Sequence, residues 1–329
     1  MEKFVSGRIA RGLAFAVVAA ALAGGAVAQD RWPSRPLRLI STSVAGGNID
    51  VMCRIIAEKL SLRLGQPVVV DNRPGAATVL GTAEAAKAPP DGYTFLVTYE
   101  GSQAINQSLY AKIPYDSIRD FQPVATLAVT PFFLIAGPRT PARSLNELIA
   151  IARAKPDTIN YASSGSGSIN HLLAEMLKTE AGIEMTHVPY KAIAAAMTDV
   201  MGGQVDVAFA SVPSVIQLVR AGRLRALAVS SARRNASAPD VPTIAESGYP
   251  AFDVNPWWGI LAPAGTPRDI VDKVNADVAA VLKDPEVLST FAKQGAEAFV
   301  TTPKQFEEML EGNVRKWAKV VKSSGARVD

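Results

Sequence analysis

Residues 36–60 read PLRLISTSVAGGNIDVMCRIIAEKL and contain one complete strand–turn–helix unit. The run PLRLI (36–40) is apolar and of strand length, whereas VMCRIIAEKL (51–60) has the spacing of an amphipathic helix. The turn between them, STSVAGGNID (41–50), is small and glycine-bearing and has no charge before Asp50. Such a turn is required either by tight packing or by a ligand that must reach the backbone.

The same alternation of short β-rich runs and helical stretches continues along the chain. It predicts the α/β class, with parallel sheets that helices cover on both faces. The length of 329 residues favours two domains. The expected strands are 37–40, 67–72, 93–99, 121–127, 131–137, 158–163, 185–190, 205–211, 224–230 and 259–263, and the expected helices are 50–64, 79–88, 144–154, 169–181, 192–202, 213–221, 267–283, 284–294 and 303–323.

The N-terminus has the features of a secretory signal peptide. Lys3, Arg8 and Arg11 precede the apolar run LAFAVVAAALAGG (13–25), and the small-x-small site AVA follows at 26–28. We therefore expect residues 1–28 to be a signal peptide that is cleaved after Ala28. No later stretch reaches the ~18 apolar residues of a membrane span, so the mature chain is expected to be soluble and exported.

Composition excludes several other classes of function. The formal net charge of +4 is small for this length and no basic cluster stands out, which gives nucleic-acid binding little support. The single cysteine, Cys53, permits no intramolecular disulfide, and its place in the apolar stripe of a helix indicates a buried residue. No His, Cys or Asp cluster has metal-ligand spacing, so we expect no metal and no cofactor.

Ligands of doubly wound folds bind beyond the carboxyl ends of the strands, where loops turn into helices. At the first such turn, residues 43–49, the glycines leave amide groups uncovered. The first N–H groups of the following helix have no internal partners and carry the positive end of its dipole. An anion can bind there without a basic side chain, although a Gly-Gly turn can also be purely structural.

A second turn of this kind lies in YASSGSGSINHLLAE (161–175), where serines and glycines separate a strand from a helix. Serine hydroxyls both donate and accept hydrogen bonds, so they can line a polar site. The alternative is a flexible serine-rich loop with an ordinary N-cap serine. Two further small polar turns follow strands at Tyr99–Gln103 and at Ala210-Ser211.

Catalytic patterns are weak in this sequence. Only His171 and His187 are present, and His187 lies in a strand-like run, which favours a structural role. His171 follows the serine cluster, but the chain has no G-x-S-x-G motif and no evident acidic partner for a triad. An exported hydrolase that uses Ser168 and His171 is the alternative from a different class. An exported two-lobed chain without catalytic residues is more typical of a solute receptor that closes on its ligand.

Longer motifs of the chain resemble one family throughout. They include LGQPVVVDNRPGA, PDGYTFL, INYASSGSGSINHL, GGQVDVAF, GRLRALAV, DVPTIAESGYP and WWGILAPAGTP. In their order and spacing they resemble the periplasmic solute-binding receptors of tripartite tricarboxylate transporters, often called Bug proteins. The resemblance covers nearly the whole mature chain.

The resemblance implies a type II periplasmic-binding-protein-like fold, with two doubly wound lobes, a ligand cleft and two hinge crossings near 129–132 and 255–258. The first lobe would comprise residues 29–130 and 257–329, and the second residues 131–256. It further implies a small carboxylate ligand and the integral membrane subunits of a transporter as partners. We expect a monomer in the periplasm. A receptor that signals to a membrane sensor instead is an alternative with the same lobes.

The resemblance also assigns the residues of the ligand site, in two loops that other turns face or line. The first loop is Ser43, Val44, Ala45, Gly46, Gly47, Asn48, Ile49 and Asp50, and the second contains Ser163, Ser164, Ser168, Ile169, Asn170 and His171. Facing or lining residues are Ala210, Ser211, Tyr99, Ser102, Gln103, Tyr190 and Trp257.

Several positions depart from the family pattern. Thr42-Ser43 stands where Pro-Phe is common, and Asn48-Ile49 where Gly-Thr is common. Ile169 removes a hydroxyl, and Ala210 replaces a frequent acid that would pair with a ligand ammonium. We therefore expect a carboxylate ligand without a free amine, with an apolar or aromatic body.

Overall fold

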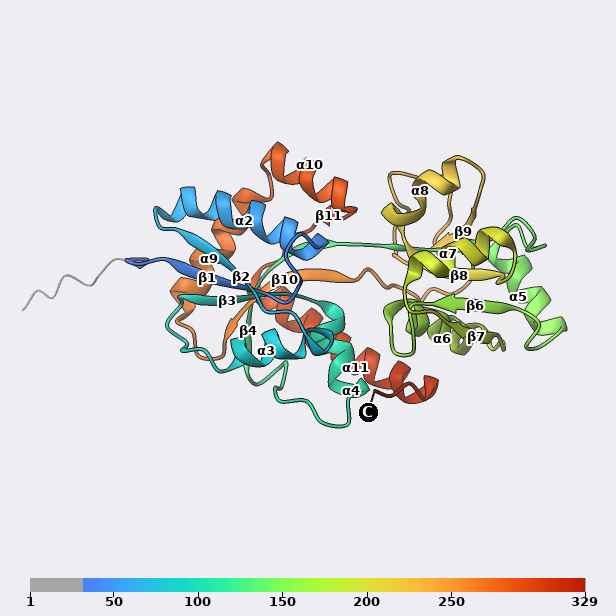
Figure 1. The fold of residues 1–329 in the computed structure, drawn as a ribbon, viewed down its shortest axis with the longest axis horizontal. Helices are drawn as coiled ribbons and strands as arrows, with labels where there is room; N and C mark the ends of the chain where they lie inside the picture. The colour runs from blue at the N-terminus through green and yellow to red at the C-terminus, as the bar shows by residue number, and fades with distance from the viewer. Residues whose placement is uncertain (1–31, 329) are drawn as a thin grey trace, which may run out of the picture.

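The computed structural model describes residues 32–328; the signal peptide expected at 1–28 lies outside them. The chain forms two β-sheets side by side, each with helices on both faces (Figure 1). This is the two-lobed α/β architecture that the sequence predicted. The expectation of parallel sheets is corrected, because each sheet also contains antiparallel strand pairs and is therefore mixed. No helix among the described residues is both long and apolar enough to cross a membrane.

The first sheet has the strand order β11-β4-β10-β3-β1-β2. Strand β1 is parallel to β2 and β3, whereas β10 is antiparallel to β3 and β4. Its strands are β1 (Leu37–Ser41), β2 (Val68–Asn72), β3 (Thr94–Tyr99), β4 (Phe121–Val129), β10 (Trp257–Pro263) and β11 (Glu297–Ala298). Its helices are α2 (Asn48–Leu64), η1 (Ala76–Thr78), α3 (Val79–Ala86), η2 (Gly101–Ile105), α4 (Asn106–Leu109), α9 (Arg268–Val281), α10 (Pro285–Gln294) and α11 (Pro303–Ser324).

The second sheet has the order β7-β6-β8-β5-β9 and repeats the plan of the first. Strand β6 is parallel to β7 and β8, and β5 is antiparallel to β8 and β9. Strand β6 therefore occupies the position of β1, and the turns after these two strands are equivalent. The strands are β5 (Phe132–Ala136), β6 (Asn160–Ser163), β7 (Thr186–Pro189), β8 (Val207–Ser211) and β9 (Arg225–Val229), with helices α5 (Leu145–Ala154), α6 (Ile169–Ala181), α7 (Ile193–Gly202) and α8 (Val212–Arg220).

Two extended segments connect the sheets (Figure 1). Strand β4 ends at Val129 and β5 begins at Phe132, and the chain returns to the first sheet where β10 begins at Trp257. The Thr130 amide donates to the Pro256 carbonyl at 2.9 Å, so the two crossing segments are bonded to each other. The exact limits of the lobes remain the prediction made above.

The C-terminal helix α11 contacts both lobes. Near its start, Phe306 packs edge-on against Trp257 of β10, with ring centroids 4.7 Å apart. Further along, Trp317 and Val321 are buried in the same apolar cluster as Leu172 and Leu177 of α6. The helix thus supplies core residues to the second lobe as well as to the first.

Local signals explain most helix ends. Gly65 and Gly182 adopt the left-handed conformation that ends α2 and α6, as expected of glycine caps. Cys53 is fully buried in α2, as its position in the apolar stripe predicted. The π-helical turn η2 was not predicted, because residues 99–103 were expected to be an open polar turn.

Candidate functional site

The candidate ligand loops follow the carboxyl ends of β1 and β6, each of which lies next to an edge strand of its sheet. The first loop follows β1 and leads into α2, and the second follows β6 and leads into α6. In Figure 1 the N-terminal end of α2 points toward the second sheet. Among the hydrogen bonds of residues 32–328, those of each loop stay within its own lobe. No hydrogen bond among the described residues therefore connects the two loops.

Glycine gives the first loop its shape. Gly46 has φ +78°, a left-handed conformation that costs other residues free energy. The Gly47 amide donates to the Val44 carbonyl at 3.1 Å, which closes the turn. A Cβ on Gly47 would lie 2.5 Å from Ser43 Oγ, so no larger residue fits without displacing that side chain. Val44, at the tip, is 61 % exposed.

The Asp50 carboxylate stabilises this loop through hydrogen bonds. One carboxylate oxygen accepts hydrogen bonds from the Gly46 amide and from Arg54 Nε, both at 2.8 Å. The other accepts from Asn72 Nδ2 at 2.7 Å, and the same amide group donates to the Ser43 carbonyl at 3.1 Å. Asp50 is 1 % exposed, so its carboxylate supports the loop and is not presented at the surface.

Electrostatics at this helix end favour an anion. Burial alone would raise the pKa of Asp50, but the hydrogen bonds from Arg54, Gly46 and Asn72 outweigh it and hold the pKa below its usual value. Asp50 is therefore ionised at neutral pH, and Arg54 balances its charge. The N-cap residue Gly47 has no side chain to occupy the first amides of α2. These amides keep their hydrogen-bonding capacity and the positive end of the helix dipole.

The second loop is built on buried side chains. Ser163 is fully buried, and its Oγ lies 2.6 Å from His187 Nε2 and accepts from the Gly165 amide at 3.1 Å. Asn170 donates to the Phe209 carbonyl at 2.7 Å and thereby ties the loop to β8. Ser164 donates to Asn170 Oδ1 at 2.8 Å. These bonds set the path of the backbone between β6 and α6.

Ser168 is the N-cap of α6, as the structural interpretation of the serine-rich turn proposed. Its Oγ accepts from the His171 amide at 3.4 Å and donates to the Gly165 carbonyl at 2.6 Å. The Gly167 amide donates to His171 Nδ1 at 3.1 Å. In contrast to α2, this helix end is already capped by its own side chain. Ile169, the first residue of α6, is partly buried and packs against the core of the second lobe.

The two histidines form an aromatic stack with Tyr161, in which His171 is buried and His187 is partly exposed. Their ring centroids lie 4.2 Å apart, and Tyr161 stacks on His187 at 4.9 Å. Burial and the neighbouring His187 lower the pKa of His171 to about 4, so His171 is neutral at pH 7. Ser168 donates to a backbone carbonyl rather than to His171. The stack packs beneath the second loop. Neither histidine accepts a hydrogen bond from Ser168, so Ser168 has no general base in this arrangement.

The remaining predicted residues lie at different depths. Ser102 and Gln103 are fully buried in η2, where Ser102 Oγ lies 2.6 Å from Thr78 Oγ1 and Gln103 donates to Thr98 at 3.3 Å. These two side chains therefore point into the protein interior and not toward solvent. Ala210 and Trp257 are buried, whereas Tyr99, Tyr190 and Ser211 are partly exposed. That any of these residues contacts a ligand remains a prediction.

Tyr190 and Ser211 already have hydrogen-bond partners within the second lobe. The Tyr190 hydroxyl donates to Asp199 Oδ2 at 2.7 Å, which raises the pKa of the tyrosine to about 12. Ser211 donates to Ser214 Oγ at 3.0 Å, just after Ala210. Asp199 is therefore occupied, and it is not an unpaired carboxylate that could bind an ammonium group.

The turn that follows β2 in the first lobe was not predicted as part of the site. The turn after β2 lies beside the first loop, because β2 pairs with β1. Ala76, Ala77 and Thr78 all have positive φ there, and Asn106 donates to the Ala77 carbonyl at 3.1 Å. Three consecutive non-glycine residues in this conformation are costly and are typical of functional sites. The sequence signal was the motif DNRPGA, which was quoted only as part of the family resemblance.

Gly167 should be the least replaceable glycine of the second loop. It has φ +76°, and a Cβ there would lie 2.6 Å from Leu109 of α4. Gly182 has φ +59° but nothing within 4 Å of the added atom. We expect Gly182→Ala to destabilise the protein by about 1 kcal/mol through backbone strain alone, and Gly167→Ala by about 2–3 kcal/mol. Urea unfolding measures both, and equal losses would show that the contact with Leu109 is easily relieved.

The described residues contain no group of three or more His, Cys, Asp or Glu side chains that could hold a metal ion. The two candidate loops themselves present backbone amides, serine hydroxyls and apolar side chains. This arrangement suits the binding of a small molecule between the lobes.

Comparison with known proteins agrees with this arrangement. The family model described as "Tripartite tricarboxylate transporter family receptor" matches residues 52–326. Protein BugT of Bordetella pertussis is 38% identical over 303 residues, which cover 92% of this chain and 93% of BugT. The R. palustris protein Rpa4515, solved with adipate, has a TM-score of 0.73 and 36% identity, covering 90% of this chain and 100% of that one. MatC from Rhodopseudomonas palustris, solved with bound malate, has a TM-score of 0.70 and 30% identity, covering 88% and 100%.

The two lobes and their opposed turns therefore define a periplasmic solute-binding protein. The chain belongs to the tripartite tricarboxylate transporter receptor family, the Bug or TctC-type receptors. Members of this family are receptors and not enzymes, which excludes the hydrolase that uses Ser168 and His171.

Proposed function

We propose that this protein is an extracytoplasmic receptor that binds a small organic acid between its lobes and delivers it to the membrane subunits of a tripartite transporter. The observation that carries the proposal is the uncapped N-terminus of α2, which the glycine-bearing loop presents toward the opposite lobe. A carboxylate placed there accepts hydrogen bonds from amides and neutralises the positive end of the helix dipole. Ligand binding would favour the closed form through its higher affinity for that form.

We further propose that the ligand lacks a free amine. Asp50 is buried and bound to Arg54, and Asp199 accepts from Tyr190. Ala210 has no charge to offer. None of these candidate positions therefore presents an unpaired carboxylate to an ammonium group. Adipate and malate, which are bound in the two related structures, are both dicarboxylates without an amine.

Isothermal titration calorimetry with four acids tests this ligand class. We expect adipate or malate to bind and to release heat, whereas aspartate and glutamate should bind at least about tenfold more weakly, because a buried ammonium without a partner is costly. Mass spectrometry of the solute that co-purifies with the protein is an independent check. Tight binding of aspartate or glutamate, with no response to the dicarboxylates, would contradict the proposal.

Delivery to a transporter is tested by capture of the transporter's membrane subunits on immobilised receptor, with and without ligand. We expect capture to increase when ligand is present. Capture of a membrane sensor in their place would favour the signalling alternative. Export is tested separately, since N-terminal sequencing of the periplasmic protein should begin at Gln29 if cleavage follows Ala28.

A further inference from the structure

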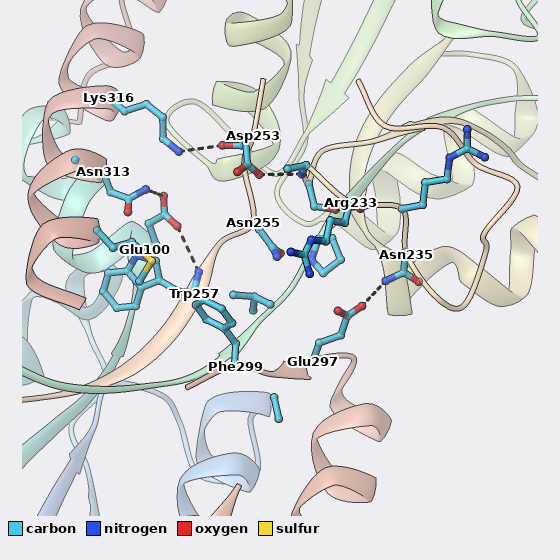
Figure 2. Close-up of a pocket in the computed structure, with 18 residues that line it drawn as sticks. Glu100, Arg233, Asn235, Asp253, Asn255, Trp257, Glu297, Phe299, Asn313 and Lys316 are labelled. Atoms are coloured by element: carbon cyan, nitrogen blue, oxygen red, sulfur yellow. Dashed lines mark hydrogen bonds between the residues drawn. The ribbon is translucent and has the colours of Figure 1, made fainter. Parts of the chain in front are cut away.

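A cavity is lined by the two crossing segments, by α11 and by residues around β11 and after β9 (Figure 2). Its volume is 640 Å³, and residues of both lobes line it. They include Asn235 and Asn255 from the second lobe, and Glu297, Phe299 and Asn313 from the first. No residue of the loops 43–50 or 163–171 is among its lining residues. We call this region the rear cavity.

Sheet order places the rear cavity opposite the ligand loops. The loops follow β1 and β6, whereas Glu297 belongs to β11, the edge strand beyond β4. Asn235 lies in the segment after β9, the edge strand beyond β5. The crossing segments connect β4 to β5 and lead back to β10, so they lie between the two regions. If the crossings act as the pivot, groups behind them move apart when the loops in front approach each other.

One short hydrogen bond connects the lobes at the rear cavity. Asn235 Nδ2 donates to Glu297 Oε1 at 2.5 Å, and Figure 2 shows the two side chains facing each other. Asn235 is 5 % exposed and is held in place because its Oδ1 accepts from the Ser237 amide at 2.9 Å. Glu297 is fixed by the pairing of β11 with Val129, the last residue of β4. Lys316, whose Nζ lies 3.4 Å from the Asp253 carbonyl, makes a second and longer contact across this side.

We propose that the Asn235–Glu297 hydrogen bond is an affinity-determining contact that stabilises the arrangement with separated ligand loops. The inference rests on the proposed function, because it concerns the regulation of the same ligand site. Closure around a ligand must lengthen and break this bond. The free energy of the bond is therefore subtracted from the free energy of ligand binding. Helix α11 also contacts both lobes, so substitutions at Asn235 and Glu297 isolate the contribution of this one bond.

Two substitutions weaken the contact and two serve as controls. Glu297→Ala removes the acceptor. Asn235→Asp keeps the Oδ1 acceptor for Ser237 but places two carboxylates against each other. Glu297→Gln retains an acceptor oxygen. Asp272→Ala removes an exposed carboxylate of the same lobe, whose partner Arg268 lies on the same helix at 2.9 Å.

Calorimetry with adipate as the probe gives the first readout. We expect Glu297→Ala and Asn235→Asp to bind adipate about three- to tenfold more tightly than the wild type. Glu297→Gln and Asp272→Ala should stay within about twofold of the wild type. Unchanged or weaker binding in both weakened variants, with wild-type melting temperatures, would overturn the proposal.

Small-angle X-ray scattering of the ligand-free proteins gives the second readout, which needs no ligand. We expect a smaller radius of gyration in Glu297→Ala and Asn235→Asp than in the two controls, because the closed form becomes more populated. If adipate does not bind to the wild type, the proposed ligand class fails and scattering alone decides the role of the contact. Equal radii in all five proteins would then overturn it.

Discussion

Replacing Asp50 by alanine is expected to weaken carboxylate binding at least about hundredfold, equivalent to about 2.7 kcal/mol. The carboxylate accepts from the Gly46 amide, Arg54 and Asn72, and it is almost completely buried. Without it, these donors lose their partner and the glycine-bearing turn loses its support. The amides of the loop would then no longer be held in position, although none of them has been changed.

A second buried carboxylate provides the matched control. Asp277 is 3 % exposed and pairs with Arg63 and Lys273 in the same lobe, in α9 and away from the ligand loops. Asp277→Ala should lower the melting temperature much as Asp50→Ala does, but it should leave the dissociation constant for the ligand unchanged. Calorimetry and thermal unfolding of both variants separate the two effects. Equal losses of affinity would show that Asp50 acts only through global stability.

Replacing Glu100 by alanine is expected to destabilise the protein by about 3–5 kcal/mol. Glu100 is 1 % exposed, and one oxygen accepts from Asn313 at 2.7 Å and from Trp317 Nε1 at 2.5 Å. The other oxygen accepts from the Trp257 amide at 3.3 Å. The side chain thus connects the end of β3 to the returning crossing segment and to α11. Alanine would leave three donors without a partner in the interior.

Glu100 also gives a pH dependence of known sign. Burial raises its pKa above the ordinary value of 4.5, against the opposing effects of Lys316 and the three donors. A raised pKa means that the folded state favours the protonated form. Its contribution to stability is therefore complete below the ordinary pKa and is lost as the pH rises through the raised value.

Glu100→Gln tests this assignment, because it is uncharged at every pH and keeps one acceptor oxygen. We expect the wild type to lose stability relative to Glu100→Gln as the pH rises above the ordinary glutamate pKa. The two proteins should be compared by urea unfolding at several pH values. A difference that is constant with pH would mean that Glu100 titrates alike in the folded and unfolded states.

Much of the fold could be predicted because local signals agree with one another. The strand–turn–helix unit at 36–60 combines an apolar run, a small turn and an amphipathic helix, and the structure contains β1 and α2 there. Gly65 and Gly182 marked helix ends for a stereochemical reason that acts within a few residues. The alternation of such units was enough to predict the two-lobed α/β class.

The site was less predictable, because the partner of a polar side chain is set by tertiary contacts. Nothing in the sequence near Asp50 shows that Asn72, 22 positions away, would donate to it. Ser102 and Gln103 follow a strand in a polar segment, yet a π-helical turn places them in the interior. Glu100 was overlooked since its partners Asn313 and Trp317 lie more than 200 residues later.

The position of α11 has a consequence for how the chain matures. Trp317 and Val321 belong to the apolar cluster of the second lobe, although that lobe is otherwise encoded far upstream. A nascent polypeptide that still lacks its final segment exposes this apolar surface to solvent. The core of the second lobe is therefore incomplete until the residues of α11 have been synthesised and have packed against it.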